Sequence, residues 1–154
     1  MIEYWQKAII CYNTFSDRKN DTVYHTKEGD ILINIGIDEV EVYLSDVKSL
    51  VKKKQYMIPK REGYLKLLDE YYIDDIMVEE IVLKLTYKDF SFADYNEHLE
   101  YKDEILYVFG KDVLLVSQSS KKEELVPLYI KFNKMDDKFV IIVSFHKQKY
   151  KLES

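Results

Sequence analysis

The feature that most constrains the fold is a series of short β-prone runs in the last third of the chain. Aliphatic and aromatic residues dominate each run, as expected for strands that are buried on at least one face. A Gly-Lys-Asp turn, a Ser/Lys/Glu loop at 117–124 and a polar turn at 135–138 separate the runs. They cover residues 105–109, 113–116, 128–132 and 139–146. From about residue 99 onward, the sequence therefore predicts an antiparallel meander.

The chain before the meander begins with extended character. Residues 31–37 are strongly β-prone, and residues 40–43 alternate apolar with polar side chains. Alternation of this kind is typical of a strand with one buried face. Two strands are therefore predicted in this part of the chain.

Three helices are predicted between these strands and the meander. Ser45 or Asp46 can cap the first, and Asp74 or Asp75 can cap the third, because short polar side chains accept hydrogen bonds from N–H groups of a first turn. The predicted helices cover residues 46–54, 65–72 and 76–85. Helices followed by a run of strands indicate an α+β fold: two to three helices packed on a C-terminal antiparallel sheet. The β-rich residues 1–45 form an N-terminal extension that is expected to pack on a main domain of residues 46–154.

Length and composition favour a single cytoplasmic domain. At 154 residues, the chain is long enough for one domain with a core and too short for two large ones. No run approaches the roughly eighteen apolar residues of a membrane span, and the N-terminus has no basic region followed by an apolar segment. The single cysteine, Cys11, excludes an intramolecular disulfide framework and fits a reducing compartment.

The charge is distributed unevenly along the chain. The net charge of −5 argues against nucleic acid as a partner, because binding to phosphates requires cations. Residues 1–45 contain 4 basic and 8 acidic residues, a net charge of −4, whereas residues 46–154 contain 19 and 20, a net charge of −1. Basic clusters in this near-neutral part, at 48–61 and 131–151, can still hold RNA.

Motifs for nucleotide, metal or serine-nucleophile sites are missing from the sequence. It contains no phosphate-binding loop, zinc-finger spacing, HExxH or GxSxG pattern. Its three histidines, His25, His98 and His146, are scattered, and only one cysteine accompanies them. We therefore expect neither a metal nor a cofactor.

Four short motifs occur in a fixed order along the second half of the chain. They are Leu83-Lys84-Leu85-Thr86-Tyr87-Lys88-Asp89-Phe90, Leu106-Tyr107-Val108-Phe109-Gly110-Lys111, Leu128-Tyr129-Ile130-Lys131-Phe132 and Val143-Ser144-Phe145-His146. The closing residues 148–152 continue the series. In order, spacing and terminal position, residues 46–154 resemble the MqsR family of toxins from bacterial type II toxin–antitoxin systems.

This resemblance implies a RelE-like α+β fold and a metal-independent endoribonuclease that cleaves messenger RNA and is neutralised by an antitoxin protein. It also places Tyr129 and His146 at positions implicated in catalysis, with Lys131 beside them. Metal-free RNA cleavage uses the ribose 2′-hydroxyl as nucleophile and needs a base, a cation and an acid. Strand alternation puts Tyr129 and Lys131 on one face, and His146 lies on the following predicted strand. The residues expected to contact RNA are Lys52, Lys53, Lys60, Arg61, Lys111, Lys147 and Lys149.

A second interpretation is a non-catalytic binding protein on the same fold, such as an immunity or inhibitor protein of a bacterial or phage conflict system. Phe92 and Val108 stand where the resemblance predicts polar residues. That departure and the net charge of −5 favour the binding protein. The retained Tyr129, Lys131 and His146 favour the ribonuclease.

Overall fold

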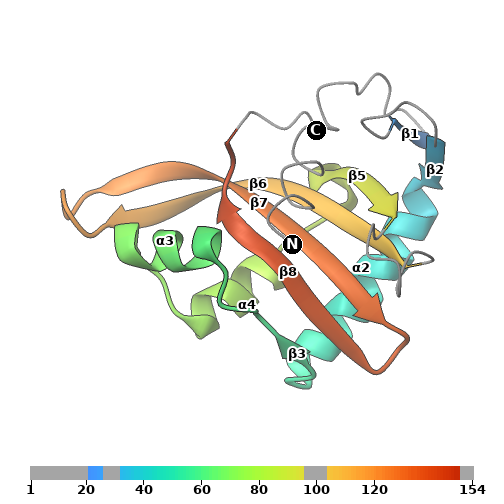
Figure 1. Cartoon of the computed structure of the whole chain (residues 1–154), viewed down its shortest axis with the longest axis horizontal. Coiled ribbons are helices and arrows are strands. Elements are labelled where there is room, and N and C mark those ends of the chain that lie inside the picture. Colours follow the sequence, from blue (N-terminus) through green and yellow to red (C-terminus); the bar gives the residue numbers. More distant parts are fainter. Residues whose placement is uncertain (1–20, 26–31, 96–103, 150–154) are drawn as a thin grey trace.

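The structure is a computed structural model that describes residues 21–25, 32–95 and 104–149. Within these residues it is an α+β protein with three α-helices and a curled mixed β-sheet (Figure 1). The strands are β1 (Asp21–His25), β2 (Leu32–Gly36), β3 (Tyr56–Met57), β4 (Tyr71–Tyr72), β5 (Phe90–Tyr95), β6 (Ile105–Ser117), β7 (Glu123–Met135) and β8 (Phe139–Lys147). The helices are α2 (Ile37–Lys52), α3 (Glu62–Glu70), α4 (Asp75–Leu83) and the short 3-10 helix η2 (Tyr87–Asp89). The predicted α+β class is therefore confirmed.

One large sheet contains all the described strands except β1 and β2. β3, β8, β7, β6 and β4 lie side by side in that order, and β5 also pairs with β6. The pairs β6–β7 and β7–β8 are antiparallel, as predicted, but β3 runs parallel to β8. The sheet is therefore mixed rather than purely antiparallel. β1 and β2 form a separate antiparallel hairpin that contacts β5.

The predicted turn at residues 110–112 is wrong. β6 runs without a break from Ile105 to Ser117, and Gly110 pairs with Tyr129 in the middle of its ladder with β7. A long partner strand supplies hydrogen bonds on both sides of the glycine, and these outweigh its local preference for a turn. The turns predicted between the last three strands are confirmed, since the chain reverses at 118–122 and at 136–138.

Helix α2 corrects two further predictions. It begins at Ile37, so residues 40–43 are helical rather than extended, and the predicted helix start at 46 is nine residues too late. Val40, Tyr43, Leu44 and Val47 are buried along it, a spacing that follows one face of a helix. The predicted division between residues 45 and 46 falls inside this helix. Predictions for residues 1–20, 26–31, 96–103 and 150–154 lie outside the described residues.

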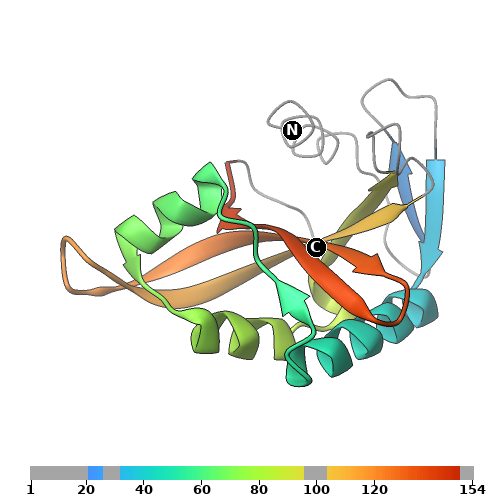
Figure 2. The ribbon, with the colours of Figure 1, turned by 60° about the horizontal axis from the view of Figure 1, so that its bottom comes forward.

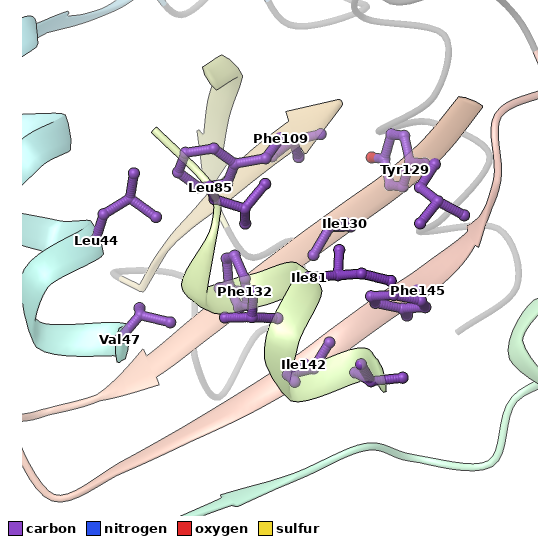
Figure 3. Close-up of a cluster of buried hydrophobic side chains, with 14 of the residues drawn as sticks. Leu44, Val47, Ile81, Leu85, Phe109, Tyr129, Ile130, Phe132, Ile142 and Phe145 are labelled. Atoms are coloured by element: carbon purple, nitrogen blue, oxygen red, sulfur yellow. The ribbon is translucent and has the colours of Figure 1, made fainter. Parts of the chain in front are cut away.

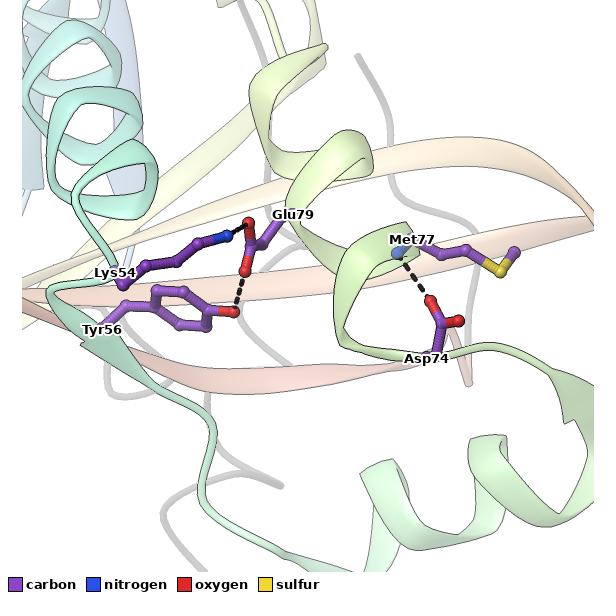
Figure 4. A network of polar contacts seen from close by, with 5 residues as sticks. All are labelled: Lys54, Tyr56, Asp74, Met77 and Glu79. Carbon is purple, nitrogen blue, oxygen red and sulfur yellow. Dashed lines mark hydrogen bonds and ion pairs between the residues drawn. The ribbon is translucent and has the colours of Figure 1, made fainter.

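The other two predicted helices are confirmed as α3 and α4. Tyr71 and Tyr72, which were predicted to end the second helix, instead form β4, because their backbone pairs with Ser117 and Val116 of β6. Asp74 caps α4, because its carboxylate accepts a hydrogen bond of 2.9 Å from the backbone N–H of Met77 (Figure 4). After α4, Thr86 and Asp89 form a capping box around η2, and the chain then becomes extended in β5. None of the helices among the described residues is long and apolar enough to cross a membrane.

The main core lies between the sheet and helices α2 and α4 (Figures 2 and 3). Leu44 and Val47 from α2 and Ile81 from α4 face buried side chains of β7 and β8, including Ile130, Phe132 and Phe145. We call this side of the sheet the helical face. Residues that alternate with these along the strands, such as Tyr129 and Lys131 in β7, point to the opposite side, which we call the polar face.

Candidate functional site

Two of the predicted catalytic residues form a stacked pair on the polar face. Tyr129 in β7 and His146 in β8 are direct partners in the antiparallel ladder. Their rings lie 4.9 Å apart between centroids and are inclined by only 10°. Cross-strand neighbours in such a ladder have side chains on the same face. The sheet register itself therefore brings these two residues together.

Helix α3 holds His146 from a different direction. A Cβ atom added to Gly63, in the first turn of α3, would lie 3.0 Å from Cβ and 3.1 Å from Cγ and Cδ2 of His146. These distances are shorter than most contacts that Cβ atoms make, so a side chain here would require His146 or α3 to shift by a few tenths of an ångström. The glycine therefore permits this close packing. The imidazole thus lies between the Tyr129 ring on its own sheet face and the backbone of α3.

The environment of His146 favours a neutral imidazole. Burial lowers its pKa below the usual 6.5, and the charges of Lys149 and Lys131 lower it further, although a hydrogen bond to a backbone carbonyl opposes them. That bond joins Nδ1 to the carbonyl oxygen of Lys147 at 2.8 Å. A carbonyl oxygen can only accept, so Nδ1 carries the proton in the neutral ring. Nε2 then has the lone pair of a general base.

Lys131 lies deeper in the same face. It pairs with Ser144 in the β7–β8 ladder, two residues from the Tyr129–His146 pair. Tyr129 is 1% exposed, Lys131 is 0% exposed and Ser144 is 3% exposed, so the group lies below the surface. A charged side chain at this depth is rare and is stabilised only by polar surroundings.

Further polar side chains are buried on the same face. Asn133 follows Lys131 by two residues in β7, and its amide donates to the carboxylate of Glu104. Asp94, in β5, is 8% exposed, and its carboxylate accepts a 2.8 Å hydrogen bond from the N–H of Tyr95. Its ladder partner Leu106 is in β6, between β5 and β7. The polar face therefore spans β5 to β8.

The two apolar residues that depart from the expected pattern meet beside this site. Phe92 and Val108 are partners in the β5–β6 ladder, and Val108 is also the partner of Lys131 in the β6–β7 ladder. Phe92 is 2% exposed and Val108 is 0% exposed. One side of Lys131 is consequently lined by packed hydrocarbon.

Lys111 and Lys147, two of the predicted RNA-binding residues, are directed away from the polar face. Lys111 adjoins Gly110, the ladder partner of Tyr129, so its side chain points to the helical face, where it is 3.5 Å from Asp89. Lys147 adjoins His146 and donates a 3.2 Å hydrogen bond to the hydroxyl of Tyr71.

The remaining predicted cations fall into two places. Lys52 lies in the last turn of α2, and Lys53 is the C-cap of that helix. The charges of Lys52 and Lys111 both lower the pKa of Lys48, so these two lysines lie near the same side chain. The other place is around His146. The charge of Lys149 lowers the pKa of this histidine. Lys60 and Arg61 directly precede α3, whose Gly63 packs against the same histidine. The structure therefore does not bring the predicted RNA-binding residues together in one region.

Sequence reasoning did not identify Gly63, Ser144 or Asp94 as part of this site. Ser144 could have been found, because it alternates with His146 across Phe145 and must share its face if the segment is a strand. Gly63 carried no local signal, since its role depends on the packing of α3 against β8. Asp94 was hidden in a short strand whose pairing depends on the distant β6.

Neither metal-ligand geometry nor similarity to known proteins assigns a function to this site. Among the described residues, no group of three His, Cys, Asp or Glu side chains is placed to hold a metal ion. Comparisons of the chain with protein-family models, curated proteins and solved structures returned no match. The chemistry has to be inferred from the polar face itself.

Proposed function

We propose that this protein is a cytoplasmic toxin of a type II toxin–antitoxin system, a metal-independent endoribonuclease that cleaves messenger RNA. The observation that carries the proposal is the stacked Tyr129–His146 pair, with Lys131 on the same face. The motif series that resembles the MqsR family supports it, as does an α+β fold compatible with the RelE type. Its partners are messenger RNA and a cognate antitoxin protein.

The proposed reaction uses each of the three side chains in a separate role. Nε2 of His146 accepts the proton of a ribose 2′-hydroxyl, whose oxygen then attacks the adjacent phosphorus. The ammonium group of Lys131 stabilises the negative charge that develops on the phosphate oxygens. The P–O5′ bond breaks, and the Tyr129 hydroxyl donates a proton to the leaving oxygen. The products are a 2′,3′-cyclic phosphate and a 5′-hydroxyl, and the proton held by His146 restores the phenol.

Access to the site is a requirement of this proposal. Tyr129 and Lys131 are almost completely buried in the structure. A phosphate group can reach them only if the side chains above them move when RNA binds. The ribonuclease is therefore expected to be slow unless RNA binding opens the polar face.

The test is incubation of the purified protein with a long single-stranded messenger RNA in EDTA. The wild type should give discrete fragments with 5′-hydroxyl ends. His146→Gln and Tyr129→Phe should reduce the initial rate by about 10²-fold or more, the usual effect of removing a general acid or base. Tyr87→Phe, a matched change at an exposed tyrosine on η2, should leave the rate unchanged.

The second candidate is the non-catalytic binding protein, for example an immunity or inhibitor protein of a conflict system. Burial of Tyr129 and Lys131 and the apolar Phe92–Val108 pair beside Lys131 favour it. Intact RNA at micromolar protein, together with a native circular dichroism spectrum, would support this candidate over the ribonuclease.

A further inference from the structure

The hairpin of β6 and β7 extends beyond the strands that flank it elsewhere. β5 pairs with β6 only at Ile105–Phe109, and β8 pairs with β7 only from Leu128 onward. We call residues 110–127 the hairpin arm. Within the described residues, its strand pairing to the rest of the sheet is limited to β4, at Val116 and Ser117. Figures 1 and 2 show the arm projecting from the body of the molecule.

The arm carries exposed apolar side chains on one face. Leu114 and Leu125 are ladder partners and are 60% and 62% exposed. Tyr72, the β4 partner of Val116, lies next to them and is 46% exposed. Single exposed leucines are common, but two directly opposite each other beside a tyrosine form a contiguous patch. Such a patch is typical of a protein-binding surface.

Carboxylates accompany this apolar patch. Asp112 and Glu123 are exposed and alternate with Leu114 and Leu125 along the two strands, so they share the same face. The Lys121 ammonium group lies over the Tyr72 ring and donates a hydrogen bond to the Tyr72 hydroxyl. This face therefore presents hydrocarbon next to negative charge.

We propose that this face of the hairpin arm is a docking surface for a protein segment that combines apolar side chains with lysine or arginine. Apolar residues of the partner would cover Leu114, Leu125 and Tyr72, and its cations would meet Asp112 and Glu123. RNA is disfavoured because its phosphates would face the two carboxylates. A second copy is disfavoured because pairing two arms would bring their acidic residues together.

The position of the surface gives it a consequence for the candidate site. Gly110 and Tyr129 continue the same face towards the sheet, and Leu125 precedes Tyr129 by four residues, or about 13 Å along a strand. A partner on the arm therefore adjoins the Tyr129–His146 pair. The docking surface itself does not depend on the proposed ribonuclease, because it involves none of the three catalytic residues.

Two synthetic probes test the charge requirement. Both are fluorescein-labelled peptides of about ten residues, one alternating leucine with lysine and the other alternating leucine with glutamate. Fluorescence anisotropy at physiological salt should show binding of the lysine peptide alone to the full-length protein. Backbone NMR shifts should be confined to the arm and Tyr72.

Paired variants test the location. Leu114→Ser with Leu125→Ser should weaken binding of the lysine peptide by roughly tenfold or more. Val42→Ser with Ile76→Ser replaces two side chains of similar exposure, 63% and 67%, on α2 and α4 and should leave binding unchanged. Both pairs change exposed positions, and circular dichroism verifies that they fold.

Three results would overturn the proposal. The first is equal binding of the two peptides, and the second is equal weakening by the two variant pairs. The third is a concentration-dependent dimer, seen by sedimentation, that the Leu114→Ser and Leu125→Ser changes abolish, because the arm would then bind its own copy. The His146→Gln variant, in contrast, tests the proposed ribonuclease. It should lose ribonuclease activity and still bind the lysine peptide as the wild type does.

Discussion

The rings of Tyr129 and His146 are stacked face to face across two neighbouring strands, 4.9 Å apart and within 10° of parallel. The ladder register fixes their partnership, and α3 limits the movement of the imidazole at Gly63. A histidine held in this way has a defined ring orientation before any ligand arrives. Such preorganisation is what a general base requires.

The lowered pKa of His146 predicts a midpoint below the usual 6.5 in an NMR titration of its ring proton. The signal is assigned by its loss in His146→Gln. Because the folded-state pKa is below the unfolded-state value, the unfolded chain binds the proton first as the pH falls. The stability contributed by this group is present above the unfolded-state pKa of about 6.5 and is lost as the pH falls through the folded-state pKa. A midpoint at or above 6.5 would contradict this description of the site.

Gly63→Ala should destabilise the protein, although alanine is the better helix former. The new Cβ would lie 3.0 Å from Cβ of His146, so α3 or the histidine must shift. The helix-propensity gain is about 0.5–1 kcal/mol, and overpacking of this kind costs about 1–3 kcal/mol. Urea unfolding should therefore show a net loss of about 1 kcal/mol, and the NMR signals of the Tyr129 and His146 rings should move. Glu62→Ala, one residue earlier, is the control, and unchanged ring signals in Gly63→Ala would refute the predicted contact.

The Lys54–Glu79–Tyr56 network ties the end of α2 and strand β3 to α4 (Figure 4). The Tyr56 hydroxyl donates a 2.5 Å hydrogen bond to Glu79, whereas the Lys54 side chain is 68% exposed. Tyr56→Phe should therefore cost about 1 kcal/mol, and Lys54→Ala less than about 0.5 kcal/mol because solvent screens the pair. Urea unfolding of both variants measures the difference. A larger loss of unfolding free energy in Lys54→Ala than in Tyr56→Phe would show that the ion pair, and not the tyrosine hydrogen bond, contributes most to the network.

The same network makes stability depend on pH through Glu79. The hydrogen bonds from Lys54 and Tyr56 lower its pKa below the usual 4.5. Its contribution is present above that value and is lost as the pH falls through the folded-state pKa. Glu79→Gln should remove this part of the acid destabilisation. An unchanged pH dependence in the variant would show that Glu79 titrates as an ordinary surface carboxylate.

The cap of α4 is a further point at which one side chain affects stability. Asp74→Ala removes the acceptor for the Met77 N–H and should reduce the free energy of unfolding by about 1 kcal/mol. Asp69→Ala, at an exposed position within α3, is the matched control and should change it by less than about 0.5 kcal/mol. Equal effects of the two substitutions would contradict the capping role.

The sequence predicted the fold best where local pattern and long-range pairing agree. The 139–146 run, the α4 cap and the two turns of the meander are examples, because hydrophobic period and turn residues give the same answer there. The strand predicted at 40–43 was wrong because four residues of alternating polarity fit both a strand and a helix. The helical spacing of the buried residues becomes clear only over the full length of α2. At 110–112, the pairing of β6 with β7 decided the structure.

The candidate site was predictable only in its strand positions. Alternation put Tyr129 and Lys131 on one face, but the partnership of Tyr129 with His146 depends on a register set by the turn at 136–138. The side-chain directions of Lys111 and Lys147 were not predicted. Each lysine follows a residue of the polar face, Gly110 or His146, so its own side chain points to the opposite face of the sheet. Burial of Lys131 could not be predicted, since it depends on what covers the sheet.

The measurement that tests the central proposal most directly compares two versions of one RNA, with ribose 2′-hydroxyls or with 2′-fluoro groups throughout. The fluoro RNA keeps the charge and base sequence but lacks the nucleophile. In EDTA, the wild type should cut the hydroxyl RNA into fragments with 5′-hydroxyl ends and leave the fluoro RNA intact, and His146→Gln should cut the hydroxyl RNA at least about 10²-fold more slowly. Cleavage of the fluoro RNA, or no cleavage of either RNA by a folded wild type, would contradict a 2′-hydroxyl mechanism at the Tyr129–His146 pair.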